Sequence, residues 1–288
     1  MTADKKLKTN VPSTWCPGCG NFVILTATKK ALTELEKEGL DLNSVVISSG
    51  IGCHAKIVDY IKINSFYSIH GRVPPAITGI KLANPGLTVI GYAGDGDAYG
   101  EGIEHLIFSA KRNLDATFVV HNNRVYGLTT GQFTPTSPST YIGRSTPRGA
   151  PEEPLNPIEL VLSAGATFVA RAFTGSAKHL QGLLKAAIHH KGFAFIDVLL
   201  PCLTFYNTGD YYKEKIYELE QTAHDPANPD EALSKAREWA YGENEAERIP
   251  TGLFYQSEKP TYSQRLLAGR IPVQMEQKDI RPVLTQLK

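Results

Sequence analysis

Along the first two hundred positions, apolar residues follow two spacings, one typical of helices and the other typical of buried strands. From residue 24 they recur every three or four positions until Gly39, which predicts a helix with Asn21 as its N-cap. Residues 87–92 instead form a continuous apolar run, as expected of a strand covered on both faces of a parallel sheet. Similar patterns predict further strands at 45–48, 66–69, 117–120, 167–172 and 193–200, and further helices at 74–84, 102–113, 157–164 and 177–190. This alternation predicts an α/β fold with a doubly wound, mainly parallel sheet.

Two segments depart from the alternation. Residues 133–157 are rich in Pro, Thr, Ser and Gly, and they predict a long loop of the kind that is often functional. Residues 210–247 hold eleven acidic side chains against four basic ones, together with several Tyr and one Trp. The charges indicate a solvated face, and the aromatics indicate packing against another surface. We therefore predict one α/β domain over 1–204 and a C-terminal extension over 205–288, which packs on that domain or on a partner.

Charge and length disfavour several classes of partner. The 288 residues carry 30 Lys and Arg against 29 Asp and Glu, so the basic excess typical of nucleic-acid or membrane-surface binding is missing. The amino terminus is polar and lacks the apolar core of a signal peptide, and no apolar run approaches the roughly 18 residues that span a bilayer. We therefore predict a cytoplasmic protein with no nucleic-acid partner and no membrane partner.

The sequence contains four cysteines, and the first two are separated only by Pro and Gly in TWCPGCGNF. The four are Cys16, Cys19, Cys53 and Cys202. A disulfide is disfavoured in a reducing cytosol, whereas four thiolates can complete a tetrathiolate metal or cluster site. Because two of the four stand alone in the sequence, such a site would tie distant segments together. On the cysteines alone, a shared site and four separate core thiols both remain open.

Polar residues follow two neighbouring strands of the predicted sheet. Gly94, Asp95 and Gly96 follow the strand at 87–92, at the carboxyl end where open α/β sheets bind their ligands. Glycine there lets the backbone approach a phosphate, and a carboxylate is a hard ligand suited to Mg²⁺. Asn123 follows the next strand, so a carboxylate and an amide would face one crevice. Taken alone, the GDG sequence could equally be an ordinary turn.

The interval between GDG and NN resembles the diphosphate-binding motif of thiamine diphosphate enzymes. Six motifs also occur in the order of the β subunit of 2-oxoacid:ferredoxin oxidoreductases, especially the archaeal two-subunit type: WCPGCG, SGIGCH, HGR, ANPGLTVIGYAGDGD, HNNRVYGLTTGQ and DVLLPC. This resemblance implies the CoA-dependent oxidative decarboxylation of a 2-oxoacid to an acyl-CoA and CO₂, with electrons passed to ferredoxin. Pyruvate, 2-oxoglutarate and a broad range of 2-oxoacids all remain open as substrates.

The same resemblance implies which residues bind the cofactors. Mg²⁺ would be held by Asp95, the Asn123 side chain and the Val125 carbonyl, and the four cysteines would bind one [4Fe–4S] cluster. Lys56 is a candidate contact for a substrate carboxylate, and Asp97 is expected at the cofactor's phosphates or their waters. Thiamine diphosphate would contact Ile51, Gly52, Cys53, His54, His70, Gly96, Asp97, Gly127 and Leu128.

One catalytic group is missing from these motifs. Thiamine enzymes need a glutamate at the aminopyrimidine, and that residue normally comes from a second domain. The sequence predicts a single α/β domain, so we expect an α subunit to supply the glutamate, in an αβ heterodimer or a dimer of heterodimers. Two alternatives remain open. One is a non-oxidative thiamine diphosphate decarboxylase or synthase subunit with a structural zinc; the other is an electron-transfer subunit that binds only a cluster.

Overall fold

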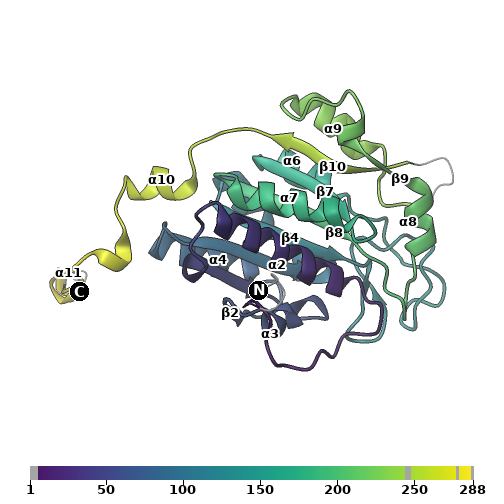
Figure 1. Cartoon of the computed structure of the whole chain (residues 1–288), viewed down its shortest axis with the longest axis horizontal. Coiled ribbons are helices and arrows are strands. Elements are labelled where there is room, and N and C mark those ends of the chain that lie inside the picture. The colour runs from purple at the N-terminus through teal and green to yellow at the C-terminus, as the bar shows by residue number, and fades with distance from the viewer. Residues whose placement is uncertain (1–5, 244–247, 277–278, 287–288) are drawn as a thin grey trace.

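An eight-stranded sheet forms the centre of the molecule in the computed structural model, which describes residues 6–243, 248–276 and 279–286 (Figure 1). From one edge to the other, its strands are β2 (Asn64–Tyr67), β1 (Val45–Ser49), β3 (Thr88–Gly94), β4 (Ala116–Asn122), β8 (Phe193–Leu199), β7 (Phe168–Phe173), β10 (Ile249–Gln256) and β9 (Ile216–Glu218). Neighbouring strands are parallel except for the antiparallel pair of β10 and β7. The prediction of a mainly parallel α/β sheet is confirmed.

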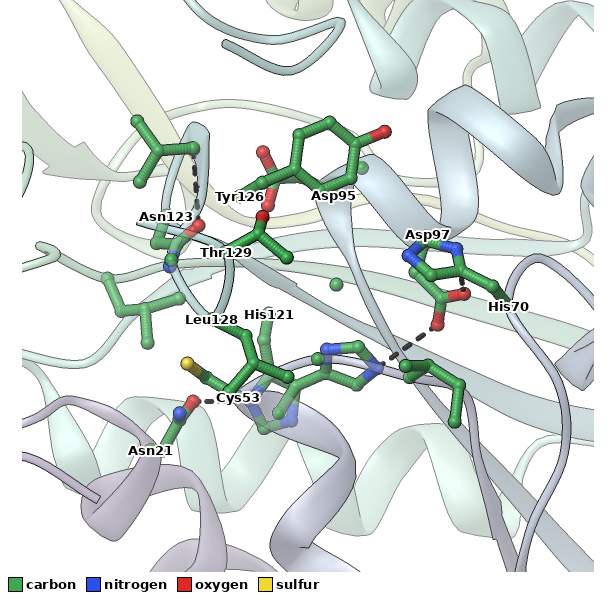
Figure 2. A pocket seen from close by; sticks show the side chains of 18 residues that line it. Asn21, Cys53, His70, Asp95, Asp97, His121, Asn123, Tyr126, Leu128 and Thr129 are labelled. Carbon is green, nitrogen blue, oxygen red and sulfur yellow. Dashed lines mark hydrogen bonds and ion pairs between the residues drawn. The ribbon is translucent and has the colours of Figure 1, made fainter. Parts of the chain in front are cut away.

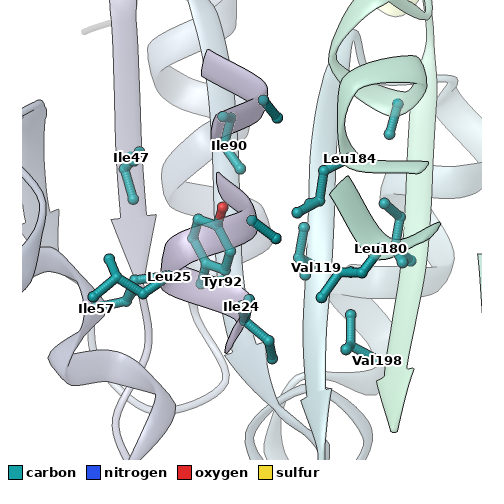
Figure 3. Packing of buried hydrophobic residues seen from close by; sticks show 14 of the residues in the cluster. Ile24, Leu25, Ile47, Ile57, Ile90, Tyr92, Val119, Leu180, Leu184 and Val198 are labelled. Carbon is teal, nitrogen blue, oxygen red and sulfur yellow. The ribbon is translucent and has the colours of Figure 1, made fainter. Parts of the chain in front are cut away.

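Helices cover both faces of this sheet, which makes it doubly wound (Figure 1). On one face lie α2 (Asn21–Lys37), α3 (Ile57–Tyr60) and α7 (Ala177–His189), and on the other lie α4 (Val73–Ala83), α5 (Ile103–Arg112), α6 (Pro157–Ser163) and α9 (Pro229–Arg237). Figure 3 shows the first layer, where Ile24 and Leu180 pack against Tyr92 and Val119 of the central strands. Because both faces are covered, the central strands are apolar without alternation.

Two sequence predictions need correction. Strand β2 lies two residues earlier than the predicted 66–69. Asn21 is not the N-cap of its helix, because Gly20 occupies that position without a side-chain cap and Asn21 is already helical. The Asn21 amide oxygen instead contacts His121 Nδ1 at 2.8 Å, so a tertiary partner takes the place of the local backbone.

Residues beyond 205 add the far edge of the sheet, which the apolar pattern did not predict. The extension contains α8 (Gly209–Lys215), α9, β9 and β10, and its Trp239 and Tyr241 are fully buried. After β10 the chain leads away from the sheet through α10 (Tyr262–Leu267) and α11 (Arg281–Gln286), as Figure 1 shows. Among the helices of the described residues, none is both long and apolar enough to cross a membrane.

The predicted loop at 133–157 connects the segment after β4 to α6. A short hairpin precedes it, in which β5 (Val125–Tyr126) pairs with β6 (Gln132–Phe133). After β6, no helix or named strand occurs until α6, all within described residues. The loop begins by returning towards the end of β3, where Thr134 and Thr136 donate hydrogen bonds to Asp95. The fold therefore brings the segments after β1, β3 and β4 to one edge of the sheet.

Candidate functional site

A pocket lies at the carboxyl ends of β1, β3 and β4, where the sequence placed the ligand site (Figure 2). All twelve residues that the resemblance assigned to thiamine diphosphate or Mg²⁺ line it: Ile51, Gly52, Cys53, His54, His70, Asp95, Gly96, Asp97, Asn123, Val125, Gly127 and Leu128. Leu128 is 48 % exposed and is therefore not a core residue. The structure brings the predicted residues together, and their roles as ligands stay predictions.

Gly94 of the GDG sequence also lines the pocket, as do five residues that were not predicted as site residues: Asn21, His121, Tyr126, Thr129 and Leu200. His121 and Tyr126 flank Asn123 in the HNNRVYG motif, so their closeness in sequence was the available signal. Burial holds the pKa of His121 well below its usual value, with the neighbouring His54 adding to the effect. His121 is therefore neutral in this pocket.

Asp95 is the carboxylate best placed for a metal ion, and it is almost completely buried. Its Oδ2 accepts hydrogen bonds from Thr134 Oγ1 at 2.5 Å and from Thr136 Oγ1 at 3.1 Å. Burial raises the pKa of Asp95 to about 7, although these two hydroxyls act against the rise. A divalent cation beside the carboxylate would favour its charged form. The Asn123 amide oxygen accepts from the Val125 backbone N–H at 3.2 Å, which folds the turn between these two predicted ligands.

Asp97 contacts two histidines, which sequence reasoning did not predict. Its Oδ2 lies 3.1 Å from His54 Nε2, its Oδ1 lies 3.1 Å from His70 Nδ1, and Oδ1 also accepts from the Gly71 N–H at 2.6 Å. Burial alone would raise the pKa of Asp97, but the hydrogen bond with His54 and the close ion-pair contact with His70 hold it well below its usual range. A Cβ on Gly50 would lie 1.8 Å from Asp97 Oδ2, so this glycine provides the space for the carboxylate.

We predict that Asp97→Asn lowers the free energy of unfolding by about 1.5–3 kcal/mol near pH 6, because it removes charge-assisted hydrogen bonds in a buried position. The pKa of Asp97 is lower in the folded chain than its ordinary 3.8, so this stability is present above that value and disappears as the pH falls through the folded pKa. The bond to Asp97 raises the pKa of His70 above its ordinary 6.5, so the contribution of His70 is present below 6.5 and disappears as the pH rises through the raised value.

Urea unfolding between pH 3 and pH 8 measures this effect. Asp210→Asn is the matched control, because the Asp210 side chain is fully exposed. A difference between Asp97→Asn and the unsubstituted chain that does not change with pH would contradict the charge-based explanation.

The four cysteines gather beside the pocket. Cys16 is exposed, and the other three are partly buried. Burial raises the pKa of the Cys19 thiol to about 11; the Asn21 backbone opposes this rise, and the other three cysteines add to it. A Cβ on Gly127 would lie 3.6 Å from Cys53 Sγ and 3.8 Å from Cys202 Sγ, so two cysteines far apart in sequence flank one glycine. In the part of the chain that the structure describes, no three Cys, His, Asp or Glu side chains are grouped closely enough for a single metal ion.

Lys56 does not line the pocket. It lies on the side of Cys53, where its charge opposes the burial that raises the pKa of that thiol. The contact between Lys56 and a substrate carboxylate stays a prediction. Cys53 itself lines the pocket and also flanks Gly127 with Cys202, so it is common to the pocket and the cysteine group.

Comparison with known proteins agrees with this arrangement. Residues 50–198 match the family described as thiamine pyrophosphate enzyme, C-terminal TPP binding domain, and residues 202–268 match the C-terminal family of the pyruvate ferredoxin oxidoreductase beta subunit. The chain is 45 % identical to 2-oxoacid:ferredoxin oxidoreductase 1, subunit beta, of Aeropyrum pernix, over 90 % of this chain and 83 % of that protein. It is 35 % identical to the 2-oxoglutarate synthase subunit KorB of Methanothermobacter marburgensis, over 89 % of this chain and 87 % of that protein.

A solved structure gives the same result for the fold. The 2-oxoglutarate:ferredoxin oxidoreductase from Magnetococcus marinus, solved with 2-oxoglutarate, coenzyme A and succinyl-CoA bound, superimposes with a TM-score of 0.87 at 35 % identity. The match covers 99 % of this chain and 96 % of the compared chain. Sequence motifs, fold and pocket thus lead to one family, and the chain belongs to the β subunits of the 2-oxoacid:ferredoxin oxidoreductases.

Proposed function

We propose that this chain carries both the thiamine diphosphate site and the [4Fe–4S] cluster of a 2-oxoacid:ferredoxin oxidoreductase, and that it works only with an α subunit. The complex would convert a 2-oxoacid, CoA and oxidised ferredoxin into an acyl-CoA, CO₂ and reduced ferredoxin. The observation that carries the proposal is the position of Cys53, which lines the pocket containing Asp95 and Asn123 and also belongs to the cysteine group.

The pocket fits a diphosphate held through Mg²⁺. Asp95, the Asn123 amide oxygen and the Val125 carbonyl are hard oxygen ligands, which Mg²⁺ prefers. The buried Asp95 carboxyl has no ion-pair partner within 4.0 Å among the described residues. A bound cation would therefore neutralise a carboxylate that no side chain of these residues neutralises. Thiamine diphosphate, when bound, supplies the carbanion centre for attack on a 2-oxoacid and retains the electrons that decarboxylation leaves.

The four cysteines are candidate ligands for a cluster rather than for a single zinc ion. In a [4Fe–4S] cluster each thiolate binds a different iron, and the cluster can accept and release an electron. Zinc has no redox chemistry. Because relatives of this chain are named ferredoxin oxidoreductases, the family favours the cluster over the zinc alternative. The pocket favours an enzyme over a simple electron carrier.

The pocket is incomplete without a partner. No glutamate is among its described lining residues, although thiamine activation requires one. Two apolar residues that line it are exposed: Ile51 at 40 % and Leu128 at 48 %. An α subunit seated on these side chains would exclude water from the pocket and supply the glutamate. Within this chain, Ile51 and Leu128 provide apolar walls, and Cys53 would place a thiolate ligand of the cluster at the pocket, where the cluster could accept electrons.

The test is co-purification with the α subunit, followed by reduction of ferredoxin or a viologen with pyruvate, 2-oxoglutarate and other 2-oxoacids. The expected result is CoA-dependent reduction with at least one 2-oxoacid. Decarboxylation without reduction of any acceptor, in a colourless protein that contains zinc, would favour the non-oxidative alternative instead.

We predict that Asp95→Ala raises the Mg²⁺ and thiamine diphosphate concentrations needed for half-maximal activity by at least roughly 100-fold. Loss of a residue that only supports a metal ligand lowers metal affinity by up to about 100-fold, so loss of a ligand itself should cost at least as much. Asn123→Ala should act in the same direction. Both variants should keep the absorbance of the cluster, because neither side chain belongs to the cysteine group. A variant that lost its iron but still bound thiamine diphosphate normally would contradict the assignment of the two sites.

A further inference from the structure

The turn that carries two of the proposed Mg²⁺ ligands is held by a residue between them. Arg124 has φ +60°, a left-handed conformation that side chains other than glycine disfavour. Its backbone N–H donates to Asn122 Oδ1 at 3.2 Å, and its carbonyl accepts from Ser137 Oγ at 2.5 Å. A strained residue at this position must be fixed by contacts elsewhere, and the Arg124 side chain makes them.

The guanidinium of Arg124 is completely buried and joins two distant segments. Its Nε donates to the Thr136 carbonyl at 2.8 Å, and the Thr136 hydroxyl in turn lies 3.1 Å from Asp95 Oδ2. Its Nη2 donates to the carbonyl of Tyr241, which belongs to the C-terminal extension. The guanidinium also lies over the Trp239 ring, 5.5 Å from its centroid. One side chain thus connects the extension to the residues around Asp95.

The receiving segment of the extension is itself rigid. The rings of Trp239 and Tyr241 stack with their centroids 4.1 Å apart, and both side chains are fully buried. The Tyr241 hydroxyl donates to Asp197 Oδ2 at 2.6 Å, and Asn122 Nδ2 donates to Asp197 Oδ1 at 3.1 Å. The extension therefore reaches the metal-binding turn by two routes, through Arg124 and through Asp197 to Asn122.

From these contacts we infer that residues 239–241 of the C-terminal extension set the shape of the metal-binding turn at 123–125, with Arg124 as the positioning residue. The inference rests on the proposed Mg²⁺ site and gives the extension a part in cofactor binding. Loss of the Arg124 contacts would allow the turn to leave its left-handed conformation, and the Asn123 and Val125 oxygens would then no longer converge with Asp95. Loss of such supporting contacts typically lowers metal affinity about 10- to 100-fold.

Arg171 offers a matched control. It is also completely buried, and its guanidinium lies 5.0 Å from the Trp239 centroid, which Arg124 also contacts, and 4.9 Å from that of Tyr241. It donates to the Pro250 carbonyl at 3.0 Å and to the Tyr241 hydroxyl at 3.1 Å, and among the described residues it makes no hydrogen bond to 123–125. Arg171→Lys therefore disturbs the same aromatic cluster without releasing the turn directly.

The experiment uses the αβ complex with thiamine diphosphate and Mn²⁺ as an EPR-visible probe for the metal site. Arg124→Gly permits the left-handed turn but removes the side-chain contacts, and we expect its Kd for Mn²⁺ to rise roughly 10- to 100-fold. Arg124→Lys, which can meet only one of the two carbonyls, should give an intermediate Kd. Arg171 reaches the turn only indirectly, through Tyr241 and Asp197, so Arg171→Lys should raise the Kd less than Arg124→Gly does, even where it lowers the melting temperature. Iron content should be normal throughout.

Unchanged Mn²⁺ affinity in Arg124→Gly, or equal weakening in Arg171→Lys, would overturn the inference and leave the Mg²⁺ site in place. An unsubstituted complex that binds no Mn²⁺ would overturn the proposed site and the inference together. If Arg124→Gly does not fold, the Kd of Arg124→Lys for Mn²⁺ is the deciding measurement, because this variant keeps the buried charge. A raised Kd would support the inference, and an unchanged Kd would overturn it.

Discussion

Cys53→Ala is expected to remove the cluster from the αβ complex and to reduce acceptor reduction to the background rate. Cys53 is common to the pocket and the cysteine group, so no neighbouring thiol of the described residues can replace it. Cys16→Ala and Cys202→Ala should have the same effect, because each of these thiolates would bind one iron of the proposed [4Fe–4S] cluster. The fold should also lose stability, since the ligands join segments that are distant in sequence. Iron and acid-labile sulfide analysis, with absorbance at about 400 nm, measures the result.

Gly127→Ala tests the same cluster site without removing a cysteine. The added Cβ would meet Cys53 Sγ and Cys202 Sγ at 3.6 and 3.8 Å, which are ordinary contacts in the chain without a cluster. A cluster bound to both thiolates would compete for the same space. The variant should therefore fold normally but bind less iron. Full iron content in any of the cysteine variants would remove that cysteine from the ligand set.

The isolated chain is expected to be inactive. In the proposed arrangement it holds the diphosphate end of the cofactor through Asp95, Asn123 and Val125, but no glutamate is among the described residues that line the pocket. Loss of a general acid–base group alone typically slows a reaction about 10²- to 10⁴-fold, and the open pocket would add to this loss. The chain should therefore bind thiamine diphosphate weakly and show at least about 10²-fold slower turnover than the αβ complex.

The measurement is an assay of residues 1–288 expressed alone, with the cluster reconstituted without oxygen, before and after the α subunit is added. Addition of the partner should restore activity in proportion to the complex formed. Turnover of the isolated chain at the rate of the complex would place the catalytic glutamate in this chain and contradict the proposed half-site.

The central strands could be predicted because burial on both faces leaves an unmistakable apolar run. β10 was missed because it lacks such a run: Pro250, Thr251 and Gly252 interrupt its apolar residues. It joins the sheet by pairing with β7, a contact between residues distant in sequence. The pocket-lining residues could be predicted because strand ends in a parallel sheet converge, and the family motifs lie at those ends.

The roles of single side chains were harder to predict, because they depend on partners from other strands. Asp97 follows GDG as a second carboxylate, yet its contacts are His54 and His70. Gly96 was expected to let the backbone approach a phosphate, but a Cβ there would also lie 2.1 Å from the Tyr126 ring. The sequence around Gly96 cannot show that the Tyr126 ring, from the following hairpin, packs against this glycine.

We propose that the pocket and the cluster of this chain act as one redox site. Rapid-freeze EPR of the αβ complex, mixed with a 2-oxoacid and CoA without external acceptor, measures this coupling. We expect the signal of a reduced [4Fe–4S]⁺ cluster to appear at the rate of CO₂ release, and Asp95→Ala to suppress both. Release of CO₂ at the normal rate while the cluster stays oxidised would show that the two sites act separately.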